Sequence, residues 1–450
     1  MMNNVADGLP VPQRYGAVLA IAIGIIMAVL DSAIANVALP TIARHFAADA
    51  ATSIWVVNAY QLAITVSLLP FASLGAIVGY RRVYCAGLAA FTLASLGCAL
   101  STSLLALTLA RIVQGFAAAG MMSVNTALIR FIYPRHLLGR GVGYNALFVA
   151  TAAAAGPTVA AGVLSVASWP WLFAINVPIG VIALITATRT LPETPRAHFP
   201  FDAVSAVLSA LTFGLLITGI DGLGHDERLA LVGVEFAAAL AVATLLVRRE
   251  LTRTEPMLPI DLLRLPVFAL SIITSVCSFA AQSLAFVSLP FYLQDVLGRS
   301  QVDTGLLMTP WPLSVAVMAP FAGRLADRYS SGILCGIGLI MLAAGLGSLA
   351  ILPIDAAAGD IAWRMVLCGL GFGLFQSPNN RTLLSSASPE RSGGASGMLA
   401  TARLLGQTTG AALVALAFGL SVRHGISVAL TMGAVFALIA GVTSTLRLLR

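Results

Sequence analysis

The chain contains no lysine, and charged residues of every kind make up only 10% of its 450 residues. Soluble proteins carry about a quarter charged residues, so this scarcity, together with a hydrophobic content of 59%, excludes one large soluble core. A P-loop needs a lysine, so nucleotide binding by that route is excluded as well. The five cysteines stand singly without a CxxC pair, and the five histidines lack paired-ligand spacing. We therefore expect no disulfide, no metal and no cofactor.

Long apolar runs dominate the rest of the sequence. They reach roughly 20 residues, the length that an α-helix needs to cross hydrocarbon, and they lack the alternation of a membrane β-barrel. The expected fold is an all-α polytopic membrane protein with about 14 transmembrane helices. We predict these helices over residues 16–37, 54–76, 83–101, 104–128, 142–165, 170–188, 203–220, 229–247, 267–293, 304–323, 332–352, 361–382, 395–420 and 426–446.

The positions of the basic residues predict the orientation in the membrane. All of them are arginine, and most fall in alternate loops and at the two ends of the chain. The opposite loops hold only Arg44, Arg228, Arg299, Arg364 and Arg423. This positive-inside pattern predicts that both termini are cytoplasmic and that the helices contact membrane lipids. It also accounts for the net charge of +7 without a nucleic-acid partner.

Two segments look like linkers. Residues 191–200 contain three prolines, and residues 248–265 form a charged run. They bracket the seventh and eighth predicted helices, which therefore look like an insertion. The predicted division is an N-terminal six-helix bundle (1–190), a linker region with an inserted helix pair (191–265) and a C-terminal six-helix bundle (266–450).

A weak internal repeat supports two similar halves. The stretch Gly75–Arg82, after the second predicted helix, is echoed by Gly323–Tyr329 after the tenth. Two similar halves with a site between them near the midplane are typical of secondary transporters.

Asp31 and Arg111 are charged residues inside otherwise apolar runs. Such residues are costly in a membrane and mark a functional site by default. Arg111 shares a helix face with Gln114 and Asn125, and it lies at a depth similar to that of Asp31, so the two charges can pair if their helices touch. A rearrangement that separates them would let the acid take up a proton, which is a proton-coupling device. The alternative is a fixed ion pair that only positions helices.

The fifth predicted helix combines small residues with a central proline at Gly156-Pro157. Small residues allow close helix contact, and proline removes a backbone hydrogen bond and bends the helix. This pattern predicts either a hinge between two cavity states or static tight packing.

Polar and aromatic residues within apolar helices are candidates for a substrate cavity. For each amide, a neighbouring helix would serve as a partner as well as a substrate would. Arg403, about two turns inside the thirteenth predicted helix, could instead extend its side chain to the surface. The cavity candidates are Asn58, Gln61, Gln114, Asn145, Gln282, Trp311, Gln376, Asn380 and Gln407.

These motifs, in their order and spacing, resemble the major facilitator superfamily, and within it the fourteen-helix drug:proton antiporters. Arg111–Ala119 is similar to the core of motif B, and Gly156-Pro157 to the centre of the antiporter motif C. Leu30–Pro40 is similar to the first-helix signature of that branch, and Trp169–Gly180 to its WRWxFxINVPxG sequence. The resemblance implies coupling or helix-ordering roles for Asp31 and Arg111. It implies gate or hinge roles for Gly79, Arg81, Arg82, Gly156, Pro157, Gly323, Asp327 and Arg328.

The chain departs from the family pattern in two motifs. Motif A normally carries an acid where this sequence has Ala76, and that acid helps to hold the cytoplasmic side closed in the family. We therefore expect a weaker inner gate and a preference for inward-facing states. Motif C ends in Ala160-Ala161 instead of its usual two glycines, which weakens the indication of export. Few additional membrane acids are present, so lipophilic monocations or neutral compounds are expected as substrates rather than dications.

The resemblance implies a proton-coupled exporter of amphipathic organic compounds in the inner membrane of a bacterium, and we expect it to be a monomer. A proton symporter that imports a nutrient would have the same fold. A membrane sensor or assembly partner without transport is a second rival, which the lack of a sizeable soluble domain disfavours. A membrane enzyme is disfavoured because no nucleophile, metal or paired-acid constellation is present.

Overall fold

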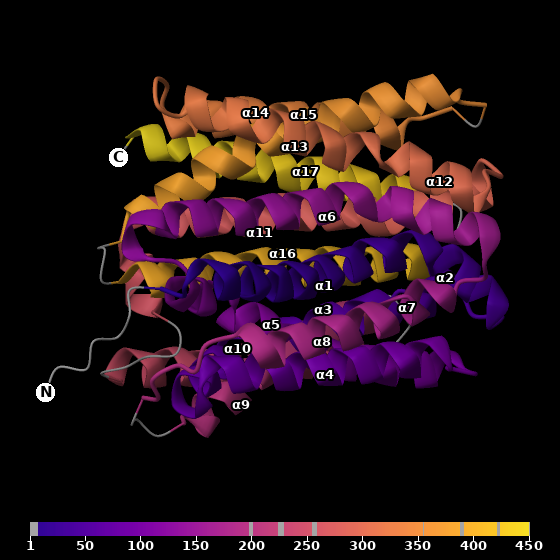
Figure 1. The fold of residues 1–450 in the computed structure, drawn as a ribbon. Helices are drawn as coiled ribbons and strands as arrows, with labels where there is room; N and C mark the ends of the chain where they lie inside the picture. Colours follow the sequence, from indigo (N-terminus) through magenta and orange to yellow (C-terminus); the bar gives the residue numbers. More distant parts are fainter. Residues whose placement is uncertain are drawn as a thin grey trace, which may run out of the picture.

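The computed structural model describes residues 8–197, 201–223, 229–253, 259–353, 355–387, 391–420 and 424–449. Within these ranges the chain forms helices and short connections, and no strand. The long helices run roughly side by side, as Figure 1 shows. The expected all-helical fold is therefore confirmed.

The first part of the chain forms six long helices and two short ones. The short helices, α2 and α7, directly precede α3 and α8 and extend them by one turn. The bounds are α1 Val11–His45, α2 Ala50–Ser53, α3 Trp55–Val78, α4 Tyr80–Ala99, α5 Leu104–Ile132, α6 Leu138–Val166, α7 Trp171–Ala174 and α8 Asn176–Thr190.

The remaining helices begin with a pair, α9 and α10, that pack against each other. The last part of the chain follows a short 3₁₀ turn at Ile260–Arg264. The bounds are α9 Ala203–Gly222, α10 Leu229–Thr252, α11 Pro266–Phe291, α12 Gln301–Met308, α13 Pro310–Leu325, α14 Ser331–Ala350, α15 Ala358–Ser385, α16 Ser392–Leu420 and α17 Gly425–Thr445.

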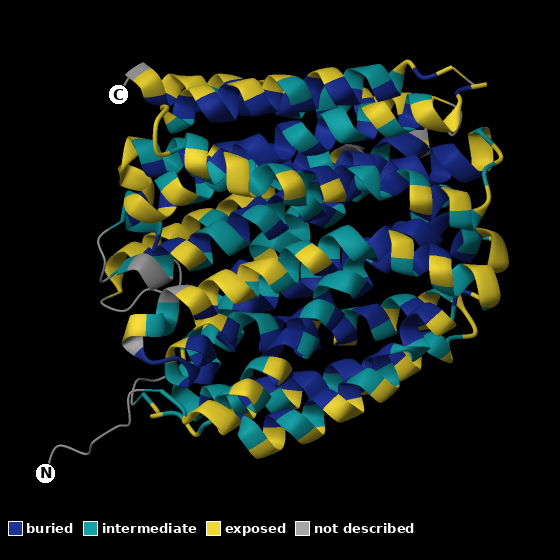
Figure 2. Ribbon diagram, turned by 45° about the horizontal axis from the view of Figure 1, so that its top comes forward, coloured by how far each residue is buried: buried dark blue, intermediate teal, exposed yellow. Residues whose placement is uncertain are grey.

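Thirteen helical stretches among the described residues are long and apolar enough to cross a membrane. The 29-residue α16 packs against α11 and α3 within the same assembly. Large apolar side chains such as Leu93, Leu105 and Ile340 are exposed on the outer helices. Figure 2 shows exposed positions alternating with buried ones along the outer helices. An apolar exterior of this kind fits a protein whose outer surface contacts lipid.

Several predicted boundaries differ from the observed ones. The helix predicted over 16–37 runs from Val11 to His45, because Pro40 is accommodated inside α1 instead of ending it. The helix predicted over 304–323 is interrupted between α12 and α13, where Pro310 lacks the N–H that would continue the ladder. The helix predicted over 267–293 continues into a π-helical turn that extends to Val296.

The molecule has two ends, which we name from α1. The terminal face is the end at which α1 begins, on the left in Figure 1, and the distal face is the end at which α1 finishes at His45. Since the long helices alternate in direction, the last helix, α17, returns to the terminal face.

Side chains join the first and last parts of the chain at the distal face. Arg44, at the end of α1, pairs with Asp295 and donates to Gln294 Oε1 at 2.8 Å. Thr158 on α6 and Thr309, between α12 and α13, share a hydrogen bond of 2.8 Å. The two parts are therefore in contact at the distal face.

Candidate functional site

A buried ion pair lies between α1 and α5. Asp31 and Arg111 are 2% and 0% exposed, and Arg111 Nη1 contacts Asp31 Oδ2 directly. Asp31 lies 14 residues before the end of α1 at His45, so it is deeper than the shorter predicted helix implied. The structure thus brings together the two charges that the sequence singled out.

Two amides complete the surroundings of the acid. Gln114 Nε2 and Asn176 Nδ2 each donate to Asp31 Oδ1 at 3.0 Å. Gln114 also donates to Ser95 Oγ at 2.9 Å, and its Oε1 accepts from Arg111 Nη1 at 2.7 Å. Helices α1, α4, α5 and α8 therefore meet at one polar cluster. Gln114 was predicted to line a substrate cavity, whereas here it is fully buried against the acid.

Asn176 is a residue of this cluster that the sequence pattern alone did not indicate. It begins α8, and it stands inside the stretch Trp169–Gly180 that carries part of the family resemblance. The motif could have indicated that Asn176 is important. It could not show which of its side chains points toward α1.

The guanidinium of Arg111 is held from several sides. Its Nε donates to the Val56 carbonyl at 3.0 Å, and its Cζ lies 4.0 Å from the centre of the Tyr60 ring. Its Nη2 has no hydrogen-bond partner. A carboxylate, a carbonyl and an aromatic face together stabilise this buried cation.

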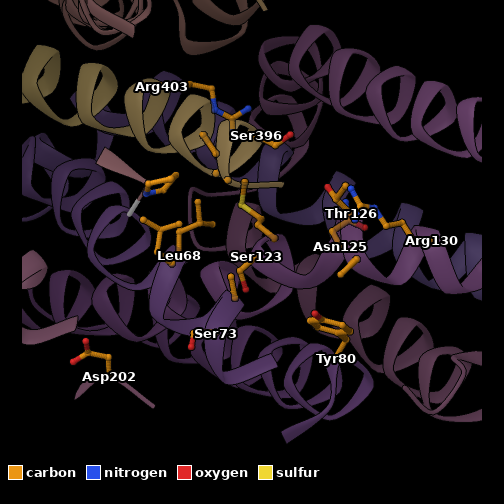
Figure 3. A pocket seen from close by; sticks show the side chains of 18 of the residues that line it. Leu68, Ser73, Tyr80, Ser123, Asn125, Thr126, Arg130, Asp202, Ser396 and Arg403 are labelled. Carbon is orange, nitrogen blue, oxygen red and sulfur yellow. The ribbon is translucent and has the colours of Figure 1, made fainter. Parts of the chain in front are cut away.

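A cavity of about 910 Å³ lies toward the terminal face. It is lined from α1, α3, α5 and α6 on one side, from α9 and α10, and from the first part of α16. Figure 3 shows Ser123, Asn125 and Arg130 of α5 around the same space as Ser396 and Arg403 of α16. The two parts of the chain therefore touch at the distal face and enclose a cavity toward the terminal face.

Two acids, Asp202 and Asp261, connect segments at the terminal face through ion pairs with arginines. Asp202, which caps α9, pairs with Arg249 at 2.9 Å and with Arg253 at 3.4 Å. Partial burial works against the charged form of Asp202, but hydrogen bonds from Arg249 and Ser205 outweigh it and lower its pKa to about 2. In the 3₁₀ turn before α11, hydrogen bonding from Arg391 lowers the pKa of Asp261 in the same way.

The predicted gate residues of motif A lie at the terminal face. Gly79 has a φ of +110° between α3 and α4, a conformation that suits glycine. Arg81 donates to the carbonyl of Thr188 and lies 3.8 Å from Glu193, while Arg82 is exposed.

The repeat of motif A is also at the terminal face. Asp327 pairs with Arg381 of α15, and the backbone of Arg328 bonds to Leu325 at 3.0 Å. Gly323 faces Ser377 in ordinary contact. The gate roles of these residues stay predictions.

Gly156 and Pro157 lie where α6 meets two other helices. A Cβ on Gly156 would overlap Ala33 of α1, and the carbonyl of Pro157 lies where a Cβ on Gly305 of α12 would be. This packing needs small residues on both sides. The position fits the static interpretation, and a hinge role stays a prediction.

The residues predicted to line a substrate cavity are dispersed. Asn145 lines the observed cavity, and its Oδ1 accepts from Asn125 Nδ2 at 2.7 Å. Trp311 is fully buried, edge-on to Phe286 at 5.1 Å between ring centres, so it belongs to the helix core. The remaining candidates lie outside the lining of this cavity: Asn58, Gln61, Gln282, Gln376, Asn380 and Gln407.

Three of those remaining candidates have unmet hydrogen-bonding capacity. Asn58 is 1% exposed with neither amide atom bonded, and Gln61 Oε1 and Asn380 Oδ1 also lack a partner among the described residues. Buried amides usually find partners, so these three stay candidates for contact with a substrate. Among the described residues, no group of three or more His, Cys, Asp or Glu could hold a metal ion.

Membrane-spanning helices in two parts that touch at one face, with a cavity toward the other, are the build of a secondary transporter. The sequence profile described as Major Facilitator Superfamily matches residues 21–411. The chain therefore belongs to that superfamily, which consists of transporters and not of enzymes.

Three relatives and one solved structure give the context. The chain is 60% identical to the uncharacterized transporter YebQ of Escherichia coli (strain K12), covering 98% of this chain and 97% of that one. It is 31% identical to the riboflavin transporter RibZ of Clostridioides difficile, covering 92% and 90%. It is also 31% identical to the tetracenomycin C resistance and export protein of Streptomyces glaucescens, covering 89% and 75%.

The fold is similar to a crystal structure of a bacterial homolog of the human lysosomal transporter Spinster in an inward-facing and occupied conformation. The TM-score is 0.69 at 14% identity, and the match covers 97% of each chain. At this identity the likeness concerns the fold alone.

Proposed function

We propose that this chain is a proton-coupled antiporter that exports amphipathic organic compounds by alternating access. The observation that carries the proposal is the fully buried pair of Asp31 and Arg111 on helices that also line the cavity. Val29, two residues before the acid on α1, and Asn125 on α5 both belong to the cavity lining. A change at the pair can therefore act directly on the walls of the cavity.

The coupling step follows from the charges in the cluster. In this structure the carboxylate of Asp31 balances the guanidinium of Arg111. Protonation of Asp31 removes that balance and leaves a buried cation, which is costly unless its surroundings rearrange. Binding of a proton is thereby linked to movement between α1 and α5. Proton entry from the distal side and release to the terminal side would drive one cycle.

The proposed membrane orientation rests on arginine distribution. Arginines such as Arg81, Arg130, Arg249 and Arg324 stand at the terminal ends of their helices, which supports a cytoplasmic terminal face. Both termini are then cytoplasmic, in the inner membrane of a bacterium. The residues 1–190 and 266–450 would be the two moving bundles, with 191–265 between them. In this orientation the cavity faces the cytoplasm, which suits uptake of a compound for export.

The relatives support export without fixing it. One relative is named for resistance to and export of tetracenomycin C, which matches the proposed direction. Another is named a riboflavin transporter, and its name gives no direction. That relative keeps a proton symporter that imports a solute as the second candidate.

Proton movement in inverted membrane vesicles tests the proposal. We expect some members of a panel of amphipathic compounds to dissipate an imposed pH gradient with the native chain and with Asp303→Asn, an exposed acid outside the cluster. Asp31→Asn should abolish the response. If no compound moves protons, while a solute enters intact cells in a gradient-dependent way, the antiporter is wrong and the importer takes its place.

A further inference from the structure

One arginine of the cavity has no hydrogen-bond or ion-pair partner among the described residues. Arg403 lines the cavity about three turns into α16, roughly 16 Å from the start of the helix. Its Nε is buried without a hydrogen-bond partner, and its guanidinium forms no ion pair. Figure 3 shows its nitrogen atoms near Ser396, one of the other α16 residues around the cavity.

Neither the orientation of the chain in the membrane nor extension of the side chain to the surface accounts for an arginine at this depth in α16. The positive-inside pattern places arginines in loops and at helix ends, whereas Arg403 is several turns from the end of its helix. The shorter helix predicted from the sequence would let its side chain extend to the surface. The structure instead places the side chain partly buried in the cavity wall. An ionisable residue at such a depth usually lines the pathway of a ligand. The question is which group balances the charge of Arg403.

The described lining of the cavity is positively charged as a whole. It holds four arginines against a single acid, Asp202, which already pairs with Arg249 and Arg253. Arg130, in the last turn of α5 at the terminal face, where we place the mouth of the cavity, is exposed and, like Arg403, forms no ion pair with a described residue. Among the described residues, the cavity therefore offers two guanidinium groups that lack an ion-pair partner, and its lining has no free carboxylate. A lipophilic cation would meet repulsion here.

The rest of the lining suits the apolar part of a ligand. Ile25 and Val29 of α1, Leu68 and Leu69 of α3 and Met122 of α5 line the same space. Guanidinium groups bind carboxylates, sulfonates and phosphates through paired charged hydrogen bonds, more strongly than neutral groups do. A molecule with an apolar body and one anionic group would satisfy both parts of the lining.

We infer that the cavity takes amphipathic organic anions, with Arg403 as the residue that binds the anionic group. This inference rests on the proposed function for its setting and departs from the cationic substrates that the sequence led us to expect. Arg130, at the mouth, attracts the anion toward the cavity. Arg403 then holds the anionic group deep in the cavity while the apolar body lies against α1 and α3.

Equilibrium dialysis with three matched probes tests this inference. The probes are naphthalenesulfonate, naphthalenemethanol and naphthyltrimethylammonium, which share a ring system and differ in charge. The protein is held in phosphatidylcholine nanodiscs, and binding to empty nanodiscs is subtracted. We expect the native chain to bind the sulfonate about tenfold or more tightly than the alcohol, and the ammonium most weakly.

Substitutions assign the effect to Arg403. We expect Arg403→Gln to weaken sulfonate binding about tenfold and to leave the alcohol unchanged, and Arg403→Lys to retain part of the preference. Arg248→Gln removes the same charge from an exposed position outside the lining and should bind as the native chain does. Thermal melting of each variant shows that it is folded.

The inference is overturned if the native chain binds the sulfonate no more tightly than the alcohol. It is equally overturned if folded Arg403→Gln keeps native sulfonate affinity. If Arg403→Gln does not fold, two other measurements test the inference: the preference of the native chain for the sulfonate over the alcohol, and the partial preference expected of Arg403→Lys. The binding measurement needs no proton gradient. If the native chain prefers the sulfonate but no compound moves protons in the vesicle assay, the proposed antiport is wrong and the inference of an anion-binding cavity still holds.

An anionic lipid headgroup shares the chemistry of the proposed ligand. Repeating the dialysis in nanodiscs that contain phosphatidylglycerol distinguishes the two sources. Loss of sulfonate binding in those discs assigns the anion site to a lipid, and unchanged binding assigns it to a soluble compound.

Discussion

At the scale of single residues, the buried pair shows how a membrane protein holds charge. Asp31 receives an arginine and two amide donors, from Gln114 and Asn176, and is nearly inaccessible. Breaking such a pair from one side leaves an uncompensated charge, whereas removing both charges leaves only polar groups. The pair is therefore more sensitive to a single substitution than to a double one.

Arg111→Gln should lower the thermal stability of the protein in nanodiscs markedly, by an amount that corresponds to about 3 kcal/mol or more. Adding Asp31→Asn to that variant should recover part of the loss, because no buried carboxylate is then left unpaired. Thermal melting of the two single variants and the double variant measures this. Arg130→Gln, at an exposed and unpaired position, is the control that should melt as the native chain does. Additive losses in the double variant would contradict the coupling of the two charges.

At the scale of elements, α9 and α10 are tied together at the terminal face by one carboxylate. Asp202 caps α9 through Ser205 N at 3.1 Å and pairs with Arg249 and Arg253 at the end of α10. The pair of helices packs along its length, and this ion pair also forms part of the cavity wall. The charge on Asp202 therefore links the stability of the α9–α10 pair to pH.

Asp202→Asn should destabilise the protein at neutral pH but not in acid. Its folded-state pKa of about 2 lies below the ordinary value of 3.8, so the charged form stabilises the folded state. That contribution is complete above about pH 5 and is lost as the pH falls from about 4 through about 2. Melting temperatures of both proteins between pH 7 and the acid limit of solubility, at roughly constant salt, measure the difference. Because asparagine can keep the cap, a difference that persists at low pH would show that the charge is not its source.

At the scale of the whole molecule, the distal face is joined and the terminal face holds the cavity. Arg44 bridges α1 to the π-helical turn after α11, and Thr158 bonds to Thr309 across the same end. At the terminal face, the carbonyl of Ala76 accepts a hydrogen bond from Ala197 N at 2.8 Å, and no carboxylate stands at that position. Without an acid at position 76, we expect the closed state of the terminal face to be less stable than in relatives that carry the motif A acid.

Ala76→Asp should shift the protein toward states with an open distal face. The added carboxylate would find arginine partners at the terminal face and stabilise its closure. Maleimide labelling of Met308→Cys, which is buried near the distal face, should become several-fold faster, and labelling of Ala400→Cys in the cavity wall slower. Ala76→Asn is the uncharged control of the same size. If the labelling rates do not change, the residue at position 76 does not control closure of the terminal face.

The sequence by itself determined the fold class and the two charges of the central pair. Apolar runs of membrane length leave helices as the only suitable form, because a backbone in lipid has to satisfy its hydrogen bonds internally. Asp31 and Arg111 stood out for the same reason, since charge inside such runs is costly. These conclusions need only local composition and spacing.

Only the tertiary structure decided which polar groups meet. Asn176 reaches Asp31 because α8 packs beside α1, and Gln114 turns to the acid instead of to a cavity. Arg403 became a candidate anion-binding residue because α16 lines the same cavity as α5, and Asp202, the one acid of the described lining, pairs with Arg249 and Arg253 instead. Such meetings depend on helix rotation and contact between distant segments, and helical spacing along one segment cannot fix either.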